Sequence, residues 1–195
     1  MIRIDRAAES DSNAIARVYV EAWRHAYAGI LPDAALLQMS AERGAAEWSW
    51  IVRHRADVQP VFVARAGGDV LGMTSIGLSR GRDRPAGGSF EPSTLEAPVG
   101  EIYTLYVAPD AQDRGIGRRL LAAGLAELAQ RRCTRSMLWV LRDNPARFFY
   151  ERTGGQRIAE RIEMLWGRPV GQLAYGWNDS GAAAARLAAC PARES

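Results

Sequence analysis

The chain has 195 residues, of which 48% are hydrophobic and 24% charged, and its formal net charge is +3. This composition indicates a globular protein with one full core and excludes an intrinsically disordered chain. The arginines are scattered, which argues against nucleic-acid binding, and neither a bilayer-spanning apolar run nor the apolar core of a signal peptide is present. We therefore expect a cytoplasmic protein without a membrane partner.

Cysteines and histidines are too few for a disulfide framework or a metal site. The two cysteines are Cys133 and Cys190, the two histidines are His25 and His54, and no pair has the spacing of metal ligands. The sequence predicts reduced thiols and no metal.

The first half of the chain mixes strand and helix patterns. Residues 2–7 alternate apolar and charged side chains, as a strand with one solvated face does. Ser10, Asp11 or Ser12 can cap the helix that follows, in which apolar residues recur at helical spacing. Next we expect a short helix, a longer helix and a hairpin that turns at Gly67-Gly68, over residues 33–39, 41–55 and 61–78.

A polar stretch rich in glycine and proline, from Arg80 to Val99, interrupts this pattern. Loops of such length are uncommon inside a compact domain. Two interpretations stay open here, a functional lid and a disordered linker.

The second half reads as strand, glycine loop, helix and strand, then a helix and a hairpin. Residues 101–107 and 136–141 flank a helix over 117–130, so the two strands are expected to be parallel neighbours. Asn144 can cap the next helix and Gly154 can end it. A closing hairpin is predicted over 157–166 and 170–177. We expect a single domain over 1–178, and over the alanine-rich 179–195 a tail or a loosely docked helix.

The segment 112–117, QDRGIG, joins the central strand to its helix. Gly115 and Gly117 lack a Cβ atom, so the backbone can approach a ligand closely, and the first helical amides carry the positive end of the dipole. A pyrophosphate group is the expected ligand, and Arg114, Arg118 or Arg119 would supply positive charge beside it. The loop has neither the Walker Lys-Ser/Thr nor the GxGxxG spacing. The alternative is a helix start that binds nothing.

Two motifs resemble the GCN5-related N-acetyltransferase (GNAT) superfamily. Gln112-x-x-Gly115-x-Gly117 resembles its acetyl-CoA loop, and Asn144 to Gly155 resembles its signature N-x-x-A-R-x-F-Y-E-R-x-G-F. The second motif has one residue fewer before Tyr150 and Gly155 in place of an aromatic residue. The resemblance covers residues 2–177. It implies an α/β fold whose central twisted sheet is mixed, mostly antiparallel, with six to seven strands, four to five flanking helices and a parallel βαβ unit that carries the loop.

The same resemblance implies acetyl-CoA as co-substrate and a set of residues that hold it. The strand at Leu105, Tyr106 and Val107 would pair with the pantetheine arm as an added strand does. The pyrophosphate would lie on Gln112, Asp113, Arg114, Gly115, Ile116, Gly117 and Arg118. Asn144 and Phe149 complete the set, and Asn144 would contact the pantetheine arm or only cap its helix.

Glu101 and Tyr150 are the candidate catalytic residues. Glu101 stands eleven positions before Gln112, where the histone-acetyltransferase branch keeps its general base, and a solvated glutamate at a strand start is the alternative. The resemblance gives Tyr150 the role of protonating the leaving thiolate, and a purely structural ring is the alternative. Another branch of the superfamily keeps a glutamate on the next strand. This chain has Trp139 at that position, so it cannot use a glutamate there.

The acceptor side is predicted from aromatic residues. Trp23-x-x-x-Tyr27 followed by Ala-Gly-Ile-Leu-Pro resembles a segment that borders the acceptor pocket of related enzymes, and core packing of the two rings is the alternative. Tyr103 and Trp139 complete the predicted substrate-binding set. We expect acetyl transfer to a primary amine of a small molecule or peptide, with a catalytically silent acyl-CoA-binding module as the alternative. A homodimer is compatible with the sequence.

Overall fold

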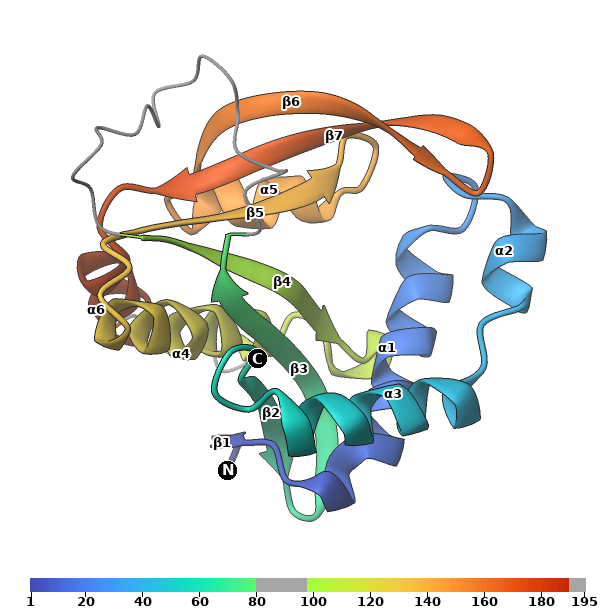
Figure 1. Ribbon diagram of the computed structural model, residues 1–195, viewed down its shortest axis with the longest axis horizontal. Coiled ribbons are helices and arrows are strands. Elements are labelled where there is room, and N and C mark those ends of the chain that lie inside the picture. The colour runs from blue at the N-terminus through green and yellow to red at the C-terminus, as the bar shows by residue number, and fades with distance from the viewer. Residues whose placement is uncertain (80–97, 190–195) are drawn as a thin grey trace.

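The computed structural model describes residues 1–79 and 98–189 (Figure 1). Its strands are β1 (Arg3–Arg6), β2 (Val61–Ala66), β3 (Asp69–Leu78), β4 (Val99–Val107), β5 (Arg135–Leu141), β6 (Gln156–Leu165) and β7 (Arg168–Trp177). Its α-helices are α1 (Ser12–Ala26), α2 (Asp33–Leu37), α3 (Ala41–His54), α4 (Ile116–Gln130), α5 (Ala146–Arg152) and α6 (Ser180–Ala189). Most of the expected lid or linker, residues 80–97, lies outside the described residues, and its last residue, Val99, begins β4.

All seven strands form one sheet in the order β1-β2-β3-β4-β5-β7-β6. Neighbouring strands are antiparallel except β4 and β5, which are parallel and are connected through α4. This confirms the predicted mixed, mostly antiparallel sheet with one parallel unit. The β2–β3 hairpin turns at Gly67, whose φ of 63° lies in the left-handed region that glycine adopts without strain.

The parallel strands β4 and β5 separate soon after they pair. Only three residue pairs join them within the described residues, and these are Val99 with Arg135, Gly100 with Ser136 and Glu101 with Met137. Beyond this junction, among the described residues, β4 pairs only with β3 and β5 only with β7, and the two strands diverge in Figure 1. Among the described residues, positions 104–107 on this edge of β4 therefore present backbone N–H and C=O groups that have no strand partner on that side.

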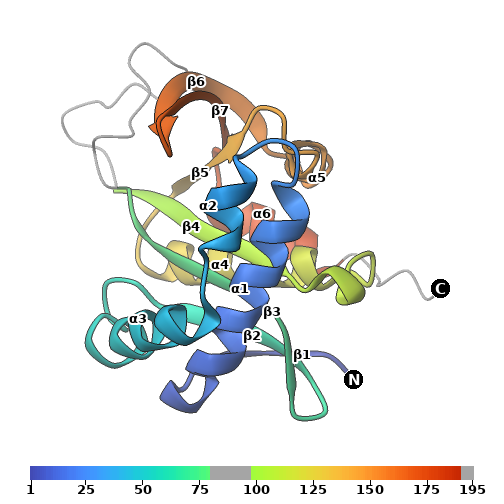
Figure 2. The ribbon, with the colours of Figure 1, turned by 90° about the vertical axis from the view of Figure 1, so that its right-hand side faces the viewer.

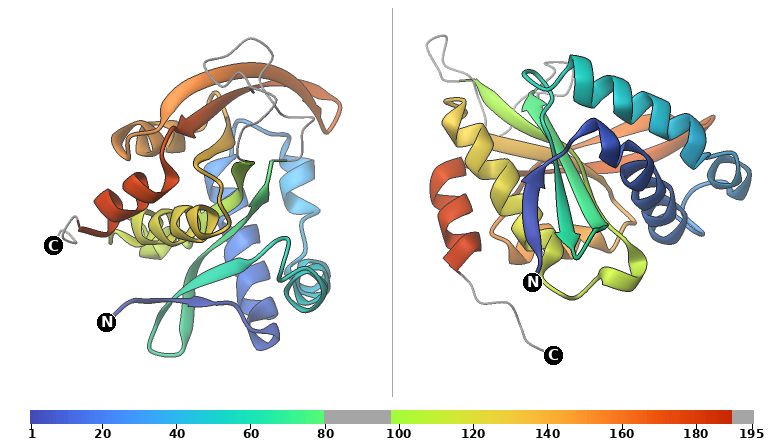
Figure 3. Two further views of the ribbon diagram at one scale, coloured as in Figure 1. Left: turned by 60° about the vertical axis from the view of Figure 1, so that its left-hand side comes forward. Right: turned by 90° about the horizontal axis from the view of Figure 1, so that it is seen from below.

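Helices cover both faces of the sheet. Helices α1 and α3 pack on one face, and α4 and α6 on the other (Figures 2 and 3). The apolar residues of α4 recur every three or four positions and form one buried stripe, which includes Leu121, Leu125 and Leu128. Gly124 lets this helix approach closely, because a Cβ atom there would lie 3.2 Å from Ile76 and Ile102. None of the described helices is long and apolar enough to cross a membrane.

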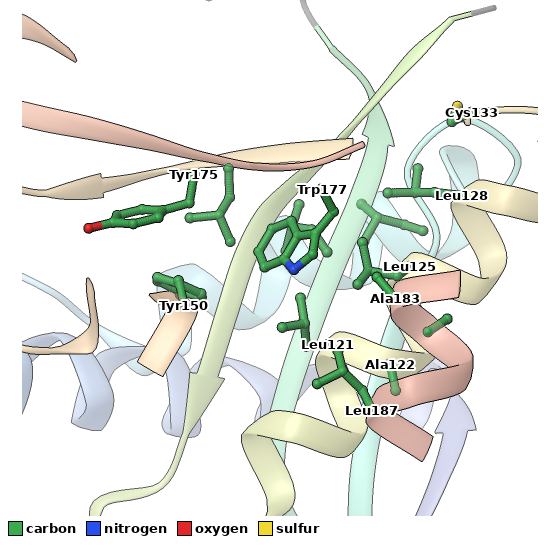
Figure 4. Close-up of a cluster of buried hydrophobic side chains, with 14 of the residues drawn as sticks. Leu121, Ala122, Leu125, Leu128, Cys133, Tyr150, Tyr175, Trp177, Ala183 and Leu187 are labelled. Atoms are coloured by element: carbon green, nitrogen blue, oxygen red, sulfur yellow. The ribbon is translucent and has the colours of Figure 1, made fainter. Parts of the chain in front are cut away.

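Helix α6 lies within the segment that the sequence marks as a tail or a loosely docked helix. Its Ala183 and Leu187 are buried against α4 in the hydrophobic cluster of Figure 4, which also holds Trp177. The Arg186 guanidinium donates a hydrogen bond of 3.2 Å to the carbonyl oxygen of Thr153. Helix α6 is therefore part of the main core, and residues 190–195 lie outside the described residues.

Leu187→Ala is expected to lower the free energy of unfolding by about 2–5 kcal/mol, the usual cost of emptying a leucine site in a core. Leu187 is 5% exposed. Urea unfolding followed by circular dichroism measures the loss. The matched control is Leu37→Ala on α2, because Leu37 is 74% exposed and its change should stay within about 0.5 kcal/mol. Equal midpoints for the two variants would show that α6 contributes no packing energy.

Candidate functional site

A cavity of about 580 Å³ lies between the diverging strands β4 and β5. Residues 102–107 of β4 and 138–140 of β5 form two of its walls. The loop before α4 and the first turn of that helix close one end, α5 forms a third wall, and α1 contributes residues 22 and 25–27. The gap in the sheet is thus the position of the site.

The backbone of the glycine loop is shaped to bind an anion. Asp113 and Gly115 have φ angles of 60° and 73°, and such left-handed residues turn neighbouring amides toward one concave side. Gly115 is the N-cap of α4, and no side chain caps this helix end. The N–H groups of the first turn and the helix dipole therefore attract a negatively charged ligand. A Cβ atom on Gly117 would lie 3.5 Å from the Phe149 ring, so the space beside this glycine is narrow.

Arg118 brings a cation and an unsatisfied donor to the same place. Its side chain lines the cavity, and its Nη1 atom is buried without a hydrogen-bond partner in the described part of the chain. Buried donors are nearly always paired, and a guanidinium is suited to phosphate oxygens. The loop and Arg118 together fit the pyrophosphate of coenzyme A.

Helix α5 places Tyr150 in the cavity. The Oδ1 atom of Asn144 accepts a hydrogen bond of 2.9 Å from the backbone N–H of Ala146, which fixes the start of the helix as predicted. The Tyr150 ring lies 5.2 Å from the ring of Phe149, and the residue is 7% exposed. Burial, and secondarily the neighbouring Tyr27, raises the pKa of the Tyr150 hydroxyl far above its usual value. The phenol therefore keeps its proton throughout the neutral range.

Aromatic residues of α1 and β4 form a cluster beside the cavity. The ring centroid of Trp23 lies 4.7 Å from that of Tyr27 and 6.4 Å from that of Tyr106. Tyr27 and Tyr106 line the cavity, and burial raises the pKa of both hydroxyls. Trp23 is partly buried against them and is not in the cavity lining of the described residues.

Trp139 forms part of the β5 wall. The guanidinium carbon of Arg161 lies 4.1 Å from the centroid of the Trp139 ring. The Nε1 atom of Trp139 is buried and has no hydrogen-bond partner among the residues that the structure describes. This N–H group is therefore available to an oxygen or nitrogen atom of a bound ligand.

Glu101 lies at the closed end of the gap, in the last pair that joins β4 to β5. It is 6% exposed and pairs with Gly77 of β3 and Met137 of β5. Because side chains alternate along a strand, Glu101 faces the same side of the sheet as Met137 and Trp139. Glu101 does not line the cavity in the described part of the chain.

The cavity brings most of the predicted residues together. Its lining includes Leu105, Tyr106, Val107, Gln112, Asp113, Gly115, Ile116, Gly117, Arg118, Asn144 and Phe149 of the cofactor set, Tyr150, and Tyr27, Tyr103 and Trp139 of the substrate set. Arg114, Trp23 and Glu101 are not in this lining.

Three polar residues of the lining were not among the predicted site residues, namely His25, Thr104 and Arg152. His25 precedes Tyr27 by two positions near the end of α1, and it is an exposed residue of the cavity lining. Arg152 follows Tyr150 by two positions in the second motif. The motif neighbourhood was the signal that could have found both His25 and Arg152. Within the described chain, no cluster of residues could hold a metal ion.

Comparison with known proteins identifies the family. Residues 15–155 match the model of the Acetyltransferase (GNAT) family. The chain is 30% identical over 180 residues to "Uncharacterized N-acetyltransferase YuaI" of Bacillus subtilis, covering 92% of this chain and 94% of that protein. It is also 31% identical over 138 residues to "Mycothiol acetyltransferase" of Saccharomonospora viridis, covering 70% of this chain but only 41% of that protein.

The fold is shared with solved structures of the same family. The structure of yncA, a putative acetyltransferase from Salmonella typhimurium with its cofactor acetyl-CoA, matches with a TM-score of 0.64 and 22% identity. The match covers 90% of this chain and 92% of that one. A family match over most of the chain, an anion-binding loop and a buried phenol in one cavity agree with one another. The chain belongs to the GNAT acetyltransferase family and is an acetyl-CoA-dependent N-acetyltransferase.

Proposed function

We propose that the cavity holds acetyl-CoA along β4 and that a primary amine attacks the donor directly while both are bound. The observation that carries this proposal is the shared cavity itself. The anion-binding loop and Tyr150 line one space, and the unpaired β4 edge runs between them. A donor with a charged end and an amide-bearing arm matches this arrangement.

Backbone groups of the glycine loop and of β4, together with the side chains of Arg118 and Gln112, are proposed to hold acetyl-CoA. The N–H groups of the loop and Arg118 would hold the pyrophosphate, with Gln112 at the loop's start. The amides of the pantetheine arm would pair with the free edge of β4 near Leu105 and Val107, as an added strand does. These contacts position the thioester, and positioning removes much of the entropic part of the barrier.

Tyr150 is the proposed proton donor to the departing thiolate. Acetyl-CoA, when bound, supplies an activated acyl group. A thiolate released inside the protein is costly unless it is protonated. Tyr150 is a buried phenol that keeps its proton at neutral pH, and it lines the donor cavity. A backbone N–H near Val107 would stabilise the charge that develops on the carbonyl oxygen.

The acceptor is proposed to be a small-molecule amine, with a peptide amine as the alternative. Tyr27, Tyr103 and Trp139 would form its walls, and the free Nε1 donor of Trp139 would orient it. The relatives named mycothiol acetyltransferases support a small molecule, although this chain spans less than half of the matched Saccharomonospora viridis protein.

Glu101 is proposed to accept the ammonium proton through water, because it lies outside the cavity lining but faces the same side of the sheet as Trp139. Glu101→Gln is expected to lower turnover most at pH values below the pKa of the amine, with a deficit that shrinks as pH rises. Initial rates from pH 6 to 10 measure this. A profile parallel to that of the parent enzyme would exclude Glu101 as the base.

Thiol release from acetyl-CoA, followed with a panel of small amines and a short peptide, tests the proposed reaction. An enzyme releases thiol only when an acceptor amine is present, in proportion to acetylated product. A catalytically silent acyl-CoA-binding module would bind CoA by calorimetry and release no thiol with any amine.

A further inference from the structure

A second hollow, which we call the α1–α3 groove, lies between helices α1 and α3 and strand β4. Its volume is about 430 Å³, and Tyr103 and Thr104 line both this groove and the donor cavity. The two spaces therefore meet at the same two residues of β4. The other residues that line the groove have no role in the proposed binding of acetyl-CoA.

Three aromatic rings line the α1–α3 groove. They come from Tyr19 of α1, Trp48 of α3 and Tyr103 of β4. The ring centroids of Tyr19 and Trp48 are 5.8 Å apart in an edge-to-face arrangement. Tyr19 also lies 5.2 Å from Tyr106, which lines the donor cavity, so the aromatic wall continues from one space to the other. Several ring faces around one space attract a cation more strongly than a neutral group.

A carboxylate stands at the rim of the same groove. Glu47 lines it and forms no ion pair in the described part of the chain. Burial is the main cause of the raised pKa of the Tyr19 hydroxyl, and the neighbouring Tyr27 and then Glu47 add to it. Arg43 also lines the groove, one turn earlier on α3, and its guanidinium donates to the carbonyl oxygen of Gln38 and forms no ion pair with Glu47 in the described part of the chain. Aromatic rings beside a carboxylate that has no ion-pair partner among the described residues are complementary to an alkylammonium group.

We propose that the α1–α3 groove binds a cationic alkylammonium group of the acceptor, separate from the amine that is acetylated in the neighbouring cavity. The inference rests on the proposed direct transfer to an amine, and it names the acceptor class as one that carries a second positive charge. Glu47 and the rings of Tyr19, Trp48 and Tyr103 would determine this specificity.

Binding of choline and of 3,3-dimethylbutan-1-ol tests the charge preference, because the two probes have the same shape and only choline is charged. Titration calorimetry is expected to show saturable millimolar binding of choline, at least ~5-fold tighter than that of the neutral alcohol. Glu47→Gln should remove most of this difference. Glu42→Gln, an exposed change on the same helix outside the groove, should retain it.

Three outcomes would each overturn the proposal. They are equal binding of both probes, no saturable binding of choline, and unchanged choline binding by the Glu47→Gln protein. Choline lacks an amine that can be acetylated, so these outcomes do not depend on turnover. Titration of CoA into the same variants reports on the donor cavity alone. Intact CoA binding with failed choline binding would reject the groove and leave the proposed reaction standing.

Discussion

Tyr150→Phe is expected to lower turnover by ~10²-fold to 10⁴-fold, the usual contribution of a general acid, with little change in acetyl-CoA affinity. The substitution removes one oxygen and keeps the ring that packs on Phe149. Its effect should appear in kcat, because the hydroxyl helps mainly when the thiolate departs. Steady-state kinetics and calorimetric titration of CoA separate the two quantities. A donor with a better leaving thiol should lose less.

Tyr175→Phe is the matched control for this loss. The Tyr175 hydroxyl donates a hydrogen bond of 2.6 Å to Glu151, and Tyr175 does not line the cavity in the described part of the chain. Removal of the Tyr175 hydroxyl should lower the free energy of unfolding by about 1 kcal/mol and leave turnover near the parental rate. A folded Tyr150→Phe enzyme that turns over at the parental rate would assign Tyr150 to packing, and the thiolate would then take its proton from water.

Gly117→Val is expected to weaken CoA binding by about 2 kcal/mol or more, which is roughly 30-fold, because it displaces charge-assisted hydrogen bonds at the pyrophosphate. A Cβ atom at this position already lies 3.5 Å from the Phe149 ring and 3.8 Å from Val107. The two further methyl groups of valine therefore have to extend toward the ligand space. Calorimetry with CoA measures the change.

Two further variants make the glycine test specific. Gly117→Ala adds only the tolerated Cβ atom and should lose less affinity than valine. Gly68→Val in the β2–β3 turn is the control for the substitution itself, since a Cβ atom there meets nothing within 4 Å. Unchanged CoA affinity in a folded Gly117→Val protein would exclude the loop as the pyrophosphate site.

Local patterns were sufficient for the elements that carry the donor site. The apolar stripe of α4, the Gly67 turn and the Asn144 cap depend on contacts between residues close in sequence, and each is found where it was predicted. The loop over 112–117 was equally visible, because the need for glycine at φ 73° is a property of one residue. These features required no knowledge of distant neighbours.

Features that depend on distant contacts were harder to predict. The position where β4 and β5 part is set by packing of segments that are about 35 residues apart in sequence. Helix α6 has few large apolar side chains, and it packs because small alanines allow a close approach to α4. Spacing in sequence does not show that Glu101 is buried where β4 pairs with β5. It also does not show that the end of α1 brings His25 to the cavity.

The three-pair junction between β4 and β5 has a thermal consequence. Strands β1 to β4 and strands β5 to β7 are joined in the ladder only by these three pairs of described residues, although the core around Tyr175 also includes Ile76 of β3 and Ile102 of β4. Acetyl-CoA bound along the exposed edge of β4 would add hydrogen bonds where β4 does not pair with β5. Ligand at 100 times its Kd stabilises a folded protein by about 2.7 kcal/mol. The melting temperature should therefore rise with the CoA concentration of the surrounding solution, so that this protein is most heat-resistant when its donor is plentiful.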